Sequence, residues 1–323
     1  MEDTMPGQRG KTVIISGGTD GMGRATALER LARGDRVTVI GSSEAKGRAL
    51  LDHAANPNLR FLRADLSSIA EVERVVADIA ERHDAVDALA LFANRISPKR
   101  RETVDGLEFT FALYYLSRYL LGSRLRPLLN AAPAPVVVNV AGVGNTAGRI
   151  FWEDPQLTRG YGQVRAQLQA GRANDLLGVA FANQFGSAGS SGNGANTGSA
   201  GSSGNAGGAG TIGNGGKAVP YVLYHPGFTR SGVDGHPNPL VRGTIKLLAT
   251  FFARQVADAV RPIVEWIDNP PTEPLSAIDR GKAVEKSLKT LDPDDAARLV
   301  AYTEDRLRRL RDLGRPEAPQ TGR

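Results

Sequence analysis

Cysteine is absent from this chain of 323 residues, which excludes disulfide bonds, a thiol nucleophile and a zinc site built from thiolates. No apolar run approaches the length of a membrane span, and the polar first ten residues lack the apolar core of a signal peptide. Aromatic residues make up only 6% of the chain, and no basic face with interleaved aromatics accompanies the net charge of +6. We therefore expect a cytoplasmic protein that contacts neither membrane nor nucleic acid and holds no metal.

A glycine-rich turn occupies residues 16–23, which read Ser-Gly-Gly-Thr-Asp-Gly-Met-Gly. The apolar run 12–15 before it predicts a buried strand, and the pattern of 24–33 after it predicts an amphipathic helix. Glycine adopts backbone angles closed to other residues and lacks a Cβ that would keep a ligand away. Unpaired amides at the helix N-terminus stabilise a pyrophosphate. This context favours a dinucleotide site over a simple tight turn.

The spacing Gly-x-x-x-Gly-x-Gly resembles that of the short-chain dehydrogenase/reductase family, and the resemblance extends over residues 11–270. It implies a Rossmann-type α/β fold, with a doubly wound parallel sheet of about seven strands in a three-layer αβα sandwich, and an NAD(P)(H) cofactor. Six strands are predicted, at 12–15, 36–40, 59–63, 86–92, 135–140 and 220–224. We expect a flexible N-terminus at 1–10, the dinucleotide-binding domain at 11–268, and a C-terminal extension at 269–323 with a helix at 292–313. Residues 275–290 receive no assignment.

The resemblance also implies which residues contact the cofactor. They are Gly17, Thr19, Asp20, Gly21, Met22 and Gly23 in the turn, Ser42, Asp65, Leu66 and Asn94 after the next three strands, and Pro226, Gly227 and Thr229 after the sixth. Asp65 has a second interpretation, in which it caps the following helix together with Ser67 or Ser68.

The choice between NAD(H) and NADP(H) depends on the end of the second strand. An acidic residue there would accept hydrogen bonds from the adenosine ribose, whereas this chain has Ser42 and Ser43. That composition favours NADP(H). Asp20 in the glycine turn would repel its 2′-phosphate, so the choice stays open.

The catalytic residues of the family are missing at the positions that the resemblance implies. Gly142 occupies the serine position, Gln167 that of the tyrosine and Gly171 that of the lysine, while a shift by one residue gives Leu168 and Arg172. A catalytic asparagine is replaced by Tyr114, within a helix expected from 103 to 129.

Four residues are candidates to replace the lost groups. Tyr161 has Arg165 four residues further on, one helical turn away, where a guanidinium could favour the phenolate. Tyr114 and Arg172 are the other two candidates. The tyrosines at 114, 115 and 119 also fit core aromatics at helical spacing.

Residues 186–216 contain 13 of the 38 glycines, mixed with serine, asparagine and alanine. Such a composition buries too little apolar surface to offset the entropy of ordering, so we expect a disordered insertion.

Three functions remain open. The first is an NAD(P)-dependent oxidoreductase acting on a ketone or alcohol of a small hydrophobic molecule with an atypical active site. The second is a non-redox enzyme such as a cyclase, isomerase or dehydratase, and the third is a protein that senses or binds the dinucleotide. Resemblance to bacterial family members of polyketide and other natural-product tailoring favours the two enzymes. We expect the oxidoreductase, and a homo-oligomer of two or four chains, since family members pair through their long central helices.

Overall fold

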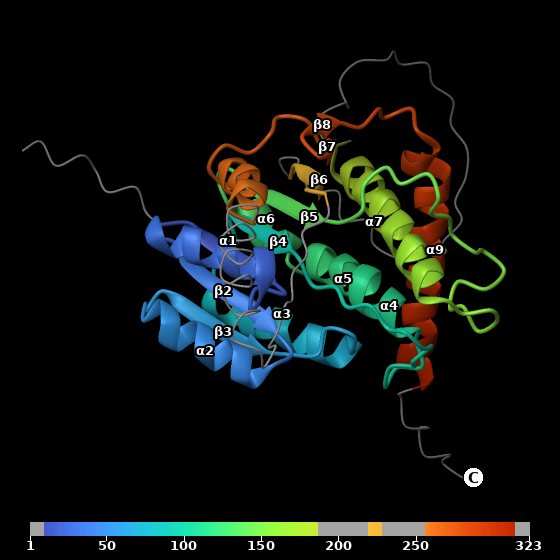
Figure 1. Ribbon diagram of the computed structural model, residues 1–323, viewed down its shortest axis with the longest axis horizontal. Helices are drawn as coiled ribbons and strands as arrows, with labels where there is room; N and C mark the ends of the chain where they lie inside the picture. Colours follow the sequence, from blue (N-terminus) through green and yellow to red (C-terminus); the bar gives the residue numbers. More distant parts are fainter. Residues whose placement is uncertain (1–9, 187–218, 228–255, 314–323) are drawn as a thin grey trace, which may run out of the picture.

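A single sheet lies between two layers of helices (Figure 1). The computed structural model describes residues 10–186, 219–227 and 256–313. The strand order in this part of the chain is β3-β2-β1-β4-β5-β6-β7-β8, with every pair parallel except β7 and β8. The chain thus starts in the middle of the sheet and builds outward in both directions, as in doubly wound folds. The predicted three-layer α/β fold is confirmed.

The strands are β1 Thr12–Ser16, β2 Arg36–Gly41, β3 Leu59–Arg63, β4 Ala88–Leu91, β5 Val136–Val140, β6 Tyr221–His225, β7 Leu275–Asp279 and β8 Lys282–Ala283. The helices are α1 Gly21–Ala32, α2 Glu44–Ala54, α3 Ile69–Arg82, α4 Phe109–Phe111, α5 Ser117–Arg124, α6 Arg126–Ala131, α7 Gln163–Gly186 and α9 Pro293–Leu313. A π-helical turn, Ala112–Leu116, joins α4 to α5, and a 3-10 turn, Lys289–Leu291, precedes α9. A further helical segment covers 256–268.

Two apolar cores lie on the two faces of the sheet because successive side chains of a strand point to opposite faces. In β1, Ile14 belongs to one core, whereas Val13 and Ile15 belong to the other, and all three are fully buried. The first core is closed by α3, α5, α7 and α9, and the second by α1, α2 and the segment 256–268. Strands buried on both faces explain the continuous apolar runs of the sequence.

The helix expected from 103 to 129 is wrong as a single element. Gly106, at φ 67°, belongs to a turn in which the Thr103 hydroxyl accepts hydrogen bonds from later backbone amides. The helix begins only at Phe109, because the Glu108 carboxylate caps it by accepting from the amides of Thr110 and Phe111. The helical run then passes through the π-helical turn into α5.

The stretch 275–290, which the sequence left unassigned, completes the sheet. β7 pairs in parallel with β6, and a tight hairpin returns the chain as β8. Arg280 and Gly281 form the turn with φ values of 47° and 77°, the left-handed angles that such hairpins require. The sheet therefore extends into the range expected for the C-terminal extension and places Asp279 beside His225.

Other expected elements agree with the structure to within a few residues. The insertion expected at 186–216 lies outside the described residues, except for Gly186, the last residue of α7. The expected flexible N-terminus also lies outside them, apart from residue 10.

Candidate functional site

The glycine turn lies at the carboxyl ends of β1 and β4, where doubly wound sheets bind nucleotides. Gly17 has φ 71°, and a Cβ on it would lie 2.7 Å from the amide nitrogen of Ala93. A Cβ on Gly23, in the first turn of α1, would lie 2.5 Å from the carbonyl oxygen of Gly17. Only glycine fits both positions. Because the turn and the helix approach each other closely and carry no side chains at these glycines, their backbone fits a pyrophosphate.

An ion pair lies at the end of β2, where the dinucleotide is expected to place its adenosine ribose. The Asp20 carboxylate accepts from the Gly21 amide at 2.8 Å and pairs with Lys46 Nζ at 2.5 Å. The hydrogen bond from Lys46 is the main reason that the pKa of Asp20 lies below its usual value. Ser43 caps α2 by accepting from the Lys46 amide. Ser42 lies between this cap and β2.

The other residues expected to contact the cofactor follow β3, β4 and β6. Asp65 accepts from the amide and hydroxyl of Ser67 at 3.0 and 2.7 Å, and Leu66 is buried. Asn94 and Gln167 exchange hydrogen bonds between their side-chain amides at 3.1 and 3.3 Å.

After β6, Gly227 has φ 95°, and a Cβ on it would contact Arg280 Cγ at 3.3 Å. Pro226 precedes it, and Thr229 lies outside the described residues.

A pocket of about 660 Å³ opens beside these loops. Its apolar lining comes from Ile96, Val143, Val164 and Leu168. Ile96 and Val164 are 61% and 64% exposed, which is unusual for large apolar side chains and gives the pocket an apolar rim. Its polar lining includes Tyr114, Gln167, His225, Asp279 and Arg280.

Tyr114 enters this pocket from the π-helical turn. Its hydroxyl oxygen accepts from the Gly142 amide at 3.2 Å, and its ring is buried. The π-helical turn alters the backbone hydrogen bonds, and the Asn174 side chain donates to the Tyr114 carbonyl at 2.8 Å. Burial is the main influence on the Tyr114 phenol and raises its pKa, so the hydroxyl stays protonated at neutral pH. Tyr115 and Tyr119 instead bond to Thr303 and Glu304 of α9.

Gly142, Gln167 and Gly171, which occupy the family's catalytic positions in the first register, all line the pocket. A Cβ on Gly142 would meet nothing within 4 Å, and one on Gly171 would meet only the Gly142 carbonyl oxygen at 3.8 Å. There is thus room for larger side chains at both glycines. In the shifted register Leu168 also lines the pocket, while Arg172 donates to the Asn145 carbonyl at 3.5 Å.

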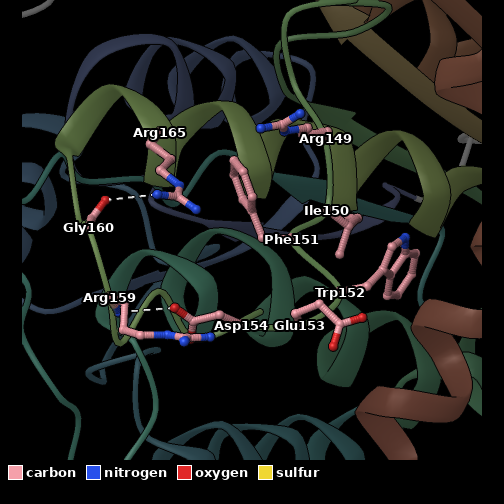
Figure 2. A pocket seen from close by; sticks show the side chains of 9 residues that line it. All are labelled: Arg149, Ile150, Phe151, Trp152, Glu153, Asp154, Arg159, Gly160 and Arg165. Carbon is pink, nitrogen blue, oxygen red and sulfur yellow. Dashed lines mark hydrogen bonds between the residues drawn. The ribbon is translucent and has the colours of Figure 1, made fainter.

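Tyr161 and Arg165 point to other partners. The Tyr161 hydroxyl donates to the Ser97 carbonyl at 2.8 Å. Arg165 lies over the ring of Phe151, 3.8 Å from its centroid, and donates to the Gly160 carbonyl (Figure 2). This side chain lines a second hollow of about 640 Å³, where Arg149 also lies over Phe151.

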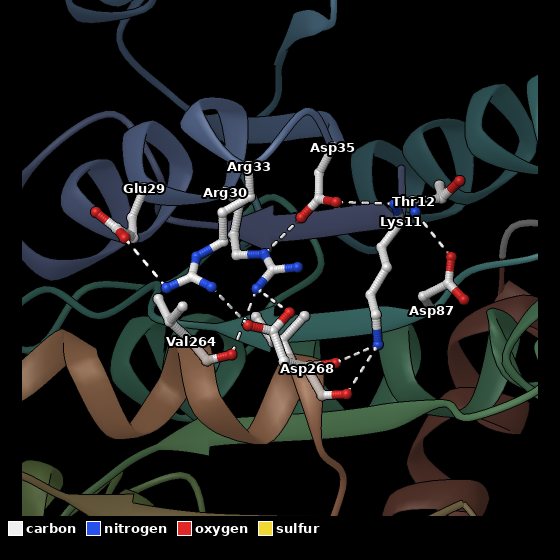
Figure 3. Close-up of polar contacts among 10 residues, drawn as sticks. Lys11, Thr12, Glu29, Arg30, Arg33, Asp35, Asp87, Val264 and Asp268 are labelled. Atoms are coloured by element: carbon white, nitrogen blue, oxygen red, sulfur yellow. Dashed lines mark hydrogen bonds and ion pairs between the residues drawn. The ribbon is translucent and has the colours of Figure 1, made fainter. Parts of the chain in front are cut away.

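A separate charged cluster lies at the amino-terminal ends of β1 and β2 (Figure 3). Arg30 is 1% exposed and pairs with Asp35 at 2.5 Å and with Asp268 at 2.6 Å. Lys11, just before β1, donates through Nζ to the carbonyl of Ile267 at 2.6 Å. These contacts fasten the segment 256–268 to α1 and β1, so the cluster serves the fold.

Sequence reasoning missed Arg118 and Asp279. Arg118 is fully buried and lies 4.6 Å from the centroid of the Tyr114 ring, four residues after it, a spacing that the sequence does display. Asp279 accepts hydrogen bonds from its neighbour Arg280 at 3.1 and 3.3 Å, but the sequence does not show its contact with His225, which lies in another strand. His225 Nδ1 lies 2.7 Å from Asp279 Oδ1, so a neutral histidine in this contact carries its proton on Nδ1.

Asp175 of α7 lies behind the pocket wall, buried, with Oδ2 accepting from the Gly144 amide at 3.1 Å. Its Oδ1 has no hydrogen-bond partner in the part of the chain that the structure describes. Burial raises the pKa of Asp175 to about 8, against smaller opposing effects of the Gly144 hydrogen bond and of Arg172.

Asp175→Asn is expected to stabilise the protein more at high pH than at low pH. The folded state keeps the Asp175 proton up to about pH 8, whereas an unfolded chain releases it near pH ~4. The contribution of this proton to stability is therefore complete below pH ~4 and is lost as the pH rises to about 8. Asparagine keeps an acceptor for Gly144 and does not titrate. Urea unfolding at about pH 5 and about pH 9 should give the variant a relative gain at the higher pH on the order of 1 kcal/mol or more. An equal difference in unfolding free energy between the variant and the wild type at both pH values would contradict the raised pKa of Asp175.

Within the described ranges, no helix is long and apolar enough to cross a membrane, and no three His, Cys, Asp or Glu side chains gather where they could hold a metal ion.

Comparisons with known proteins agree with this geometry. A family model described as short chain dehydrogenase matches residues 11–151. Retinol dehydrogenase 13 of Mus musculus is 30% identical over 149 residues, which is 45% of each chain. Oxidoreductase calI of Penicillium decumbens is 28% identical over 190 residues, 55% of each chain. The chain thus spans about half the length of the curated relatives that it matches.

Solved structures extend the likeness in fold. A protein of Mycobacterium paratuberculosis is 21% identical and matches with a TM-score of 0.67, covering 94% of this chain and 96% of the other. A short chain dehydrogenase of Shigella flexneri complexed with NADP is 14% identical, with a TM-score of 0.53, covering 85% of this chain and 100% of the other. The resemblance to the short chain dehydrogenase family thus covers residues 11–151, which hold the glycine turn and the strands from β1 to β5.

Proposed function

We propose that this protein is an NAD(P)-dependent oxidoreductase that reduces a ketone of a small hydrophobic molecule. The observation that carries the proposal is the Tyr114 hydroxyl, which lines the pocket and accepts a hydrogen bond from the Gly142 amide. That bond uses an oxygen lone pair, so the hydroxyl proton stays available for an acceptor in the pocket. The glycine turn, with Gly17 and Gly23, would hold a nicotinamide dinucleotide, which would supply hydride.

Tyr114 is the proton donor in this mechanism. Tyr114 would give its hydroxyl proton to the carbonyl oxygen of the substrate, while a dinucleotide bound at the glycine turn would supply hydride to the carbonyl carbon and leave as the oxidised cofactor. The resulting phenolate recovers a proton from solvent. The raised pKa means that the phenol carries its proton at neutral pH, the state that a general acid needs before it reacts.

An apolar substrate is favoured by the pocket lining. Ile96, Val164 and Leu168 leave apolar surface that a hydrophobic ketone would cover. A polyketide or another natural product of this chemistry is the class that we propose.

NADP(H) is the cofactor that we propose, and the contact between Lys46 and Asp20 supports it. The lysine neutralises the carboxylate that would otherwise repel a 2′-phosphate, and its ammonium group lies at the end of β2. Lys46→Glu is expected to raise the Kd for NADPH about tenfold, the size of one charge-assisted hydrogen bond, with a smaller change for NADH. Arg48→Glu is the matched control, since Arg48 is an exposed cation of α2 that pairs with Glu44. Calorimetry that gives both variants the same ratio of NADPH to NADH affinity would contradict the preference.

A redox-silent protein is the second candidate, either a non-redox enzyme or a dinucleotide sensor. Gly142, Gln167 and Gly171 supply neither the proton nor the charge that serine, tyrosine and lysine would supply at these positions.

The test is to incubate the protein with NADPH and a panel of polycyclic ketones while following NADPH absorbance and products. The proposal requires one alcohol formed for each NADPH oxidised. A product formed without oxidation of NADPH would establish the non-redox enzyme. Tight NADPH binding without any conversion would favour the sensor.

A further inference from the structure

Arg118 is a buried cation held entirely by neutral groups within the described part of the chain. Its side chain is 1% exposed. The guanidinium donates to the Asn139 side chain, to the Val140 carbonyl at 2.9 Å and to the Ala93 carbonyl at 3.0 Å. Its Nε has no hydrogen-bond partner among the described residues. No carboxylate balances this charge in any ion pair of the described residues.

Such a placement is costly. Taking a guanidinium out of water without an anionic partner carries a desolvation penalty that hydrogen bonds to neutral acceptors offset only in part. The same cost is visible in the pKa of Arg118, which burial lowers. A residue that only tied β4 to β5 could make such bonds without a charge, as Asn139 does with Asn174 and Tyr221. Holding β4 and β5 together therefore does not explain why this residue carries a positive charge.

Two phenols lie near this charge, that of Tyr221, which accepts a hydrogen bond from Asn139, and that of Tyr114, which lines the pocket. The guanidinium carbon lies 4.6 Å from the centroid of the Tyr114 ring. Two charged side chains influence this phenol: Arg118 from the same helical run lowers its pKa, and Asp175 from α7 raises it. The Gly142 amide, from the loop after β5, adds a hydrogen bond to the hydroxyl oxygen. Arg118 is thus the positively charged side chain that acts on the Tyr114 phenol.

We propose that Arg118 is a positioning residue that stabilises the phenolate of Tyr114 in the moment after Tyr114 gives its proton to the substrate. The inference rests on the proposed function, because it assigns Arg118 a part in the same proton transfer. A cation over the face of a neutral ring gains modest energy, and it gains much more when the ring carries a negative charge in a water-poor site. The guanidinium is fixed by bonds to the ends of β4 and β5, so no reorganisation is needed when the charge develops.

The test is a titration of the phenol itself, which needs no catalytic activity. A fluorinated tyrosine, whose phenol is more acidic than that of tyrosine, replaces Tyr114, and fluorine NMR follows its ionisation with pH. Arg118→Gln removes the charge and keeps two of the hydrogen-bond donors, while Arg118→Lys keeps the charge and loses the planar set of guanidinium donors. We expect the midpoint to rise by about 1–3 pH units in Arg118→Gln, the usual effect of losing an opposite charge at this distance, and by less in Arg118→Lys.

Arg101→Met is the matched control, because Arg101 lies 4.5 Å over the ring of Phe109 near the same helical run but does not face Tyr114. It should leave the midpoint unchanged. An unchanged midpoint in a folded Arg118→Gln variant would overturn the inference, and so would equal shifts in Arg118→Gln and Arg118→Lys. Should Arg118→Gln fail to fold, the wild type and Arg118→Lys decide, since a Lys variant shifted by the full 1–3 units would likewise refute a role for the charge.

The failure of this inference can be told from the failure of the proposed function. If Tyr114→Phe abolishes reduction while substitution of Arg118 leaves the titration midpoint unchanged, only the positioning role of Arg118 is refuted. If the wild-type protein oxidises no NADPH with any ketone of the panel, the proposed function is refuted whatever the midpoint does, and if Tyr114→Phe keeps full activity, Tyr114 is not the proton donor. The kinetic counterpart is the pH dependence of kcat for reduction, whose loss at high pH should move to still higher pH in Arg118→Gln.

Discussion

Tyr114→Phe is expected to lower kcat for ketone reduction by about 10²–10⁴-fold, the usual size of general acid catalysis by one positioned side chain. The substitution removes only the hydroxyl, which is the proton donor in the proposed mechanism. NADPH affinity should stay unchanged, because the ring remains and the glycine turn is untouched. Steady-state kinetics with a ketone that the wild-type protein reduces measures kcat, and calorimetry measures the affinity for NADPH.

Tyr161→Phe separates the two tyrosines that the sequence offered. The Tyr161 hydroxyl already donates to the Ser97 carbonyl, so its loss should leave kcat close to the wild-type value. Thermal unfolding of both variants controls for stability, since Tyr114→Phe also leaves the Gly142 amide without its acceptor. Full activity in Tyr114→Phe together with a large loss in Tyr161→Phe would reverse the assignment of the proton donor.

Gly23→Ala is expected to weaken NADPH binding by on the order of 10²-fold, the loss that a misplacement of about 1 Å can cause. The added Cβ would lie 2.5 Å from the Gly17 carbonyl oxygen and 3.0 Å from Gly18 Cα, so the turn must move away from the helix. The backbone that cradles the pyrophosphate then loses its shape. Isothermal calorimetry with NADPH measures the change directly.

Gly122→Ala provides the matched control for this substitution. Gly122 lies in α5, and its Cβ would make ordinary contacts with the ring of Phe181, at 3.4 and 3.8 Å. It should bind NADPH as the wild type does. Wild-type affinity in a folded Gly23→Ala variant would mean that the dinucleotide does not bind at the glycine turn.

The glycine turn could be predicted from the sequence because its signal is local. Strand, glycines and helix follow one another within about twenty residues, and the backbone angle of Gly17 follows from the residue type. The strands of the sheet could be predicted for the same reason, since runs such as that of β5 are buried on both faces. The conformation of the glycine turn and of these strands follows from residues that are close together in the sequence.

The pocket could not be predicted in this way because its polar residues meet through tertiary contacts. Asp279 reaches His225 only when β7 pairs with β6, and β7 is a short strand whose polar residues give no clear strand pattern. Tyr114 turns toward Gly142 through a π-helical turn, which no periodicity of period 3.6 anticipates. The spacing of Arg118 from Tyr114 is visible in the sequence, but its burial without a counter-ion is not.

Transfer of deuterium tests the central claim most directly. The wild-type protein is incubated with NADPH that carries deuterium at C4 of the nicotinamide and with the ketone panel, and the products are analysed by mass spectrometry. We expect an alcohol with deuterium on its carbinol carbon, in an amount equal to the oxidised cofactor formed. Conversion of substrate without deuterium in the product, or bound NADPH with no conversion of any ketone, would contradict the assignment of this protein as an oxidoreductase.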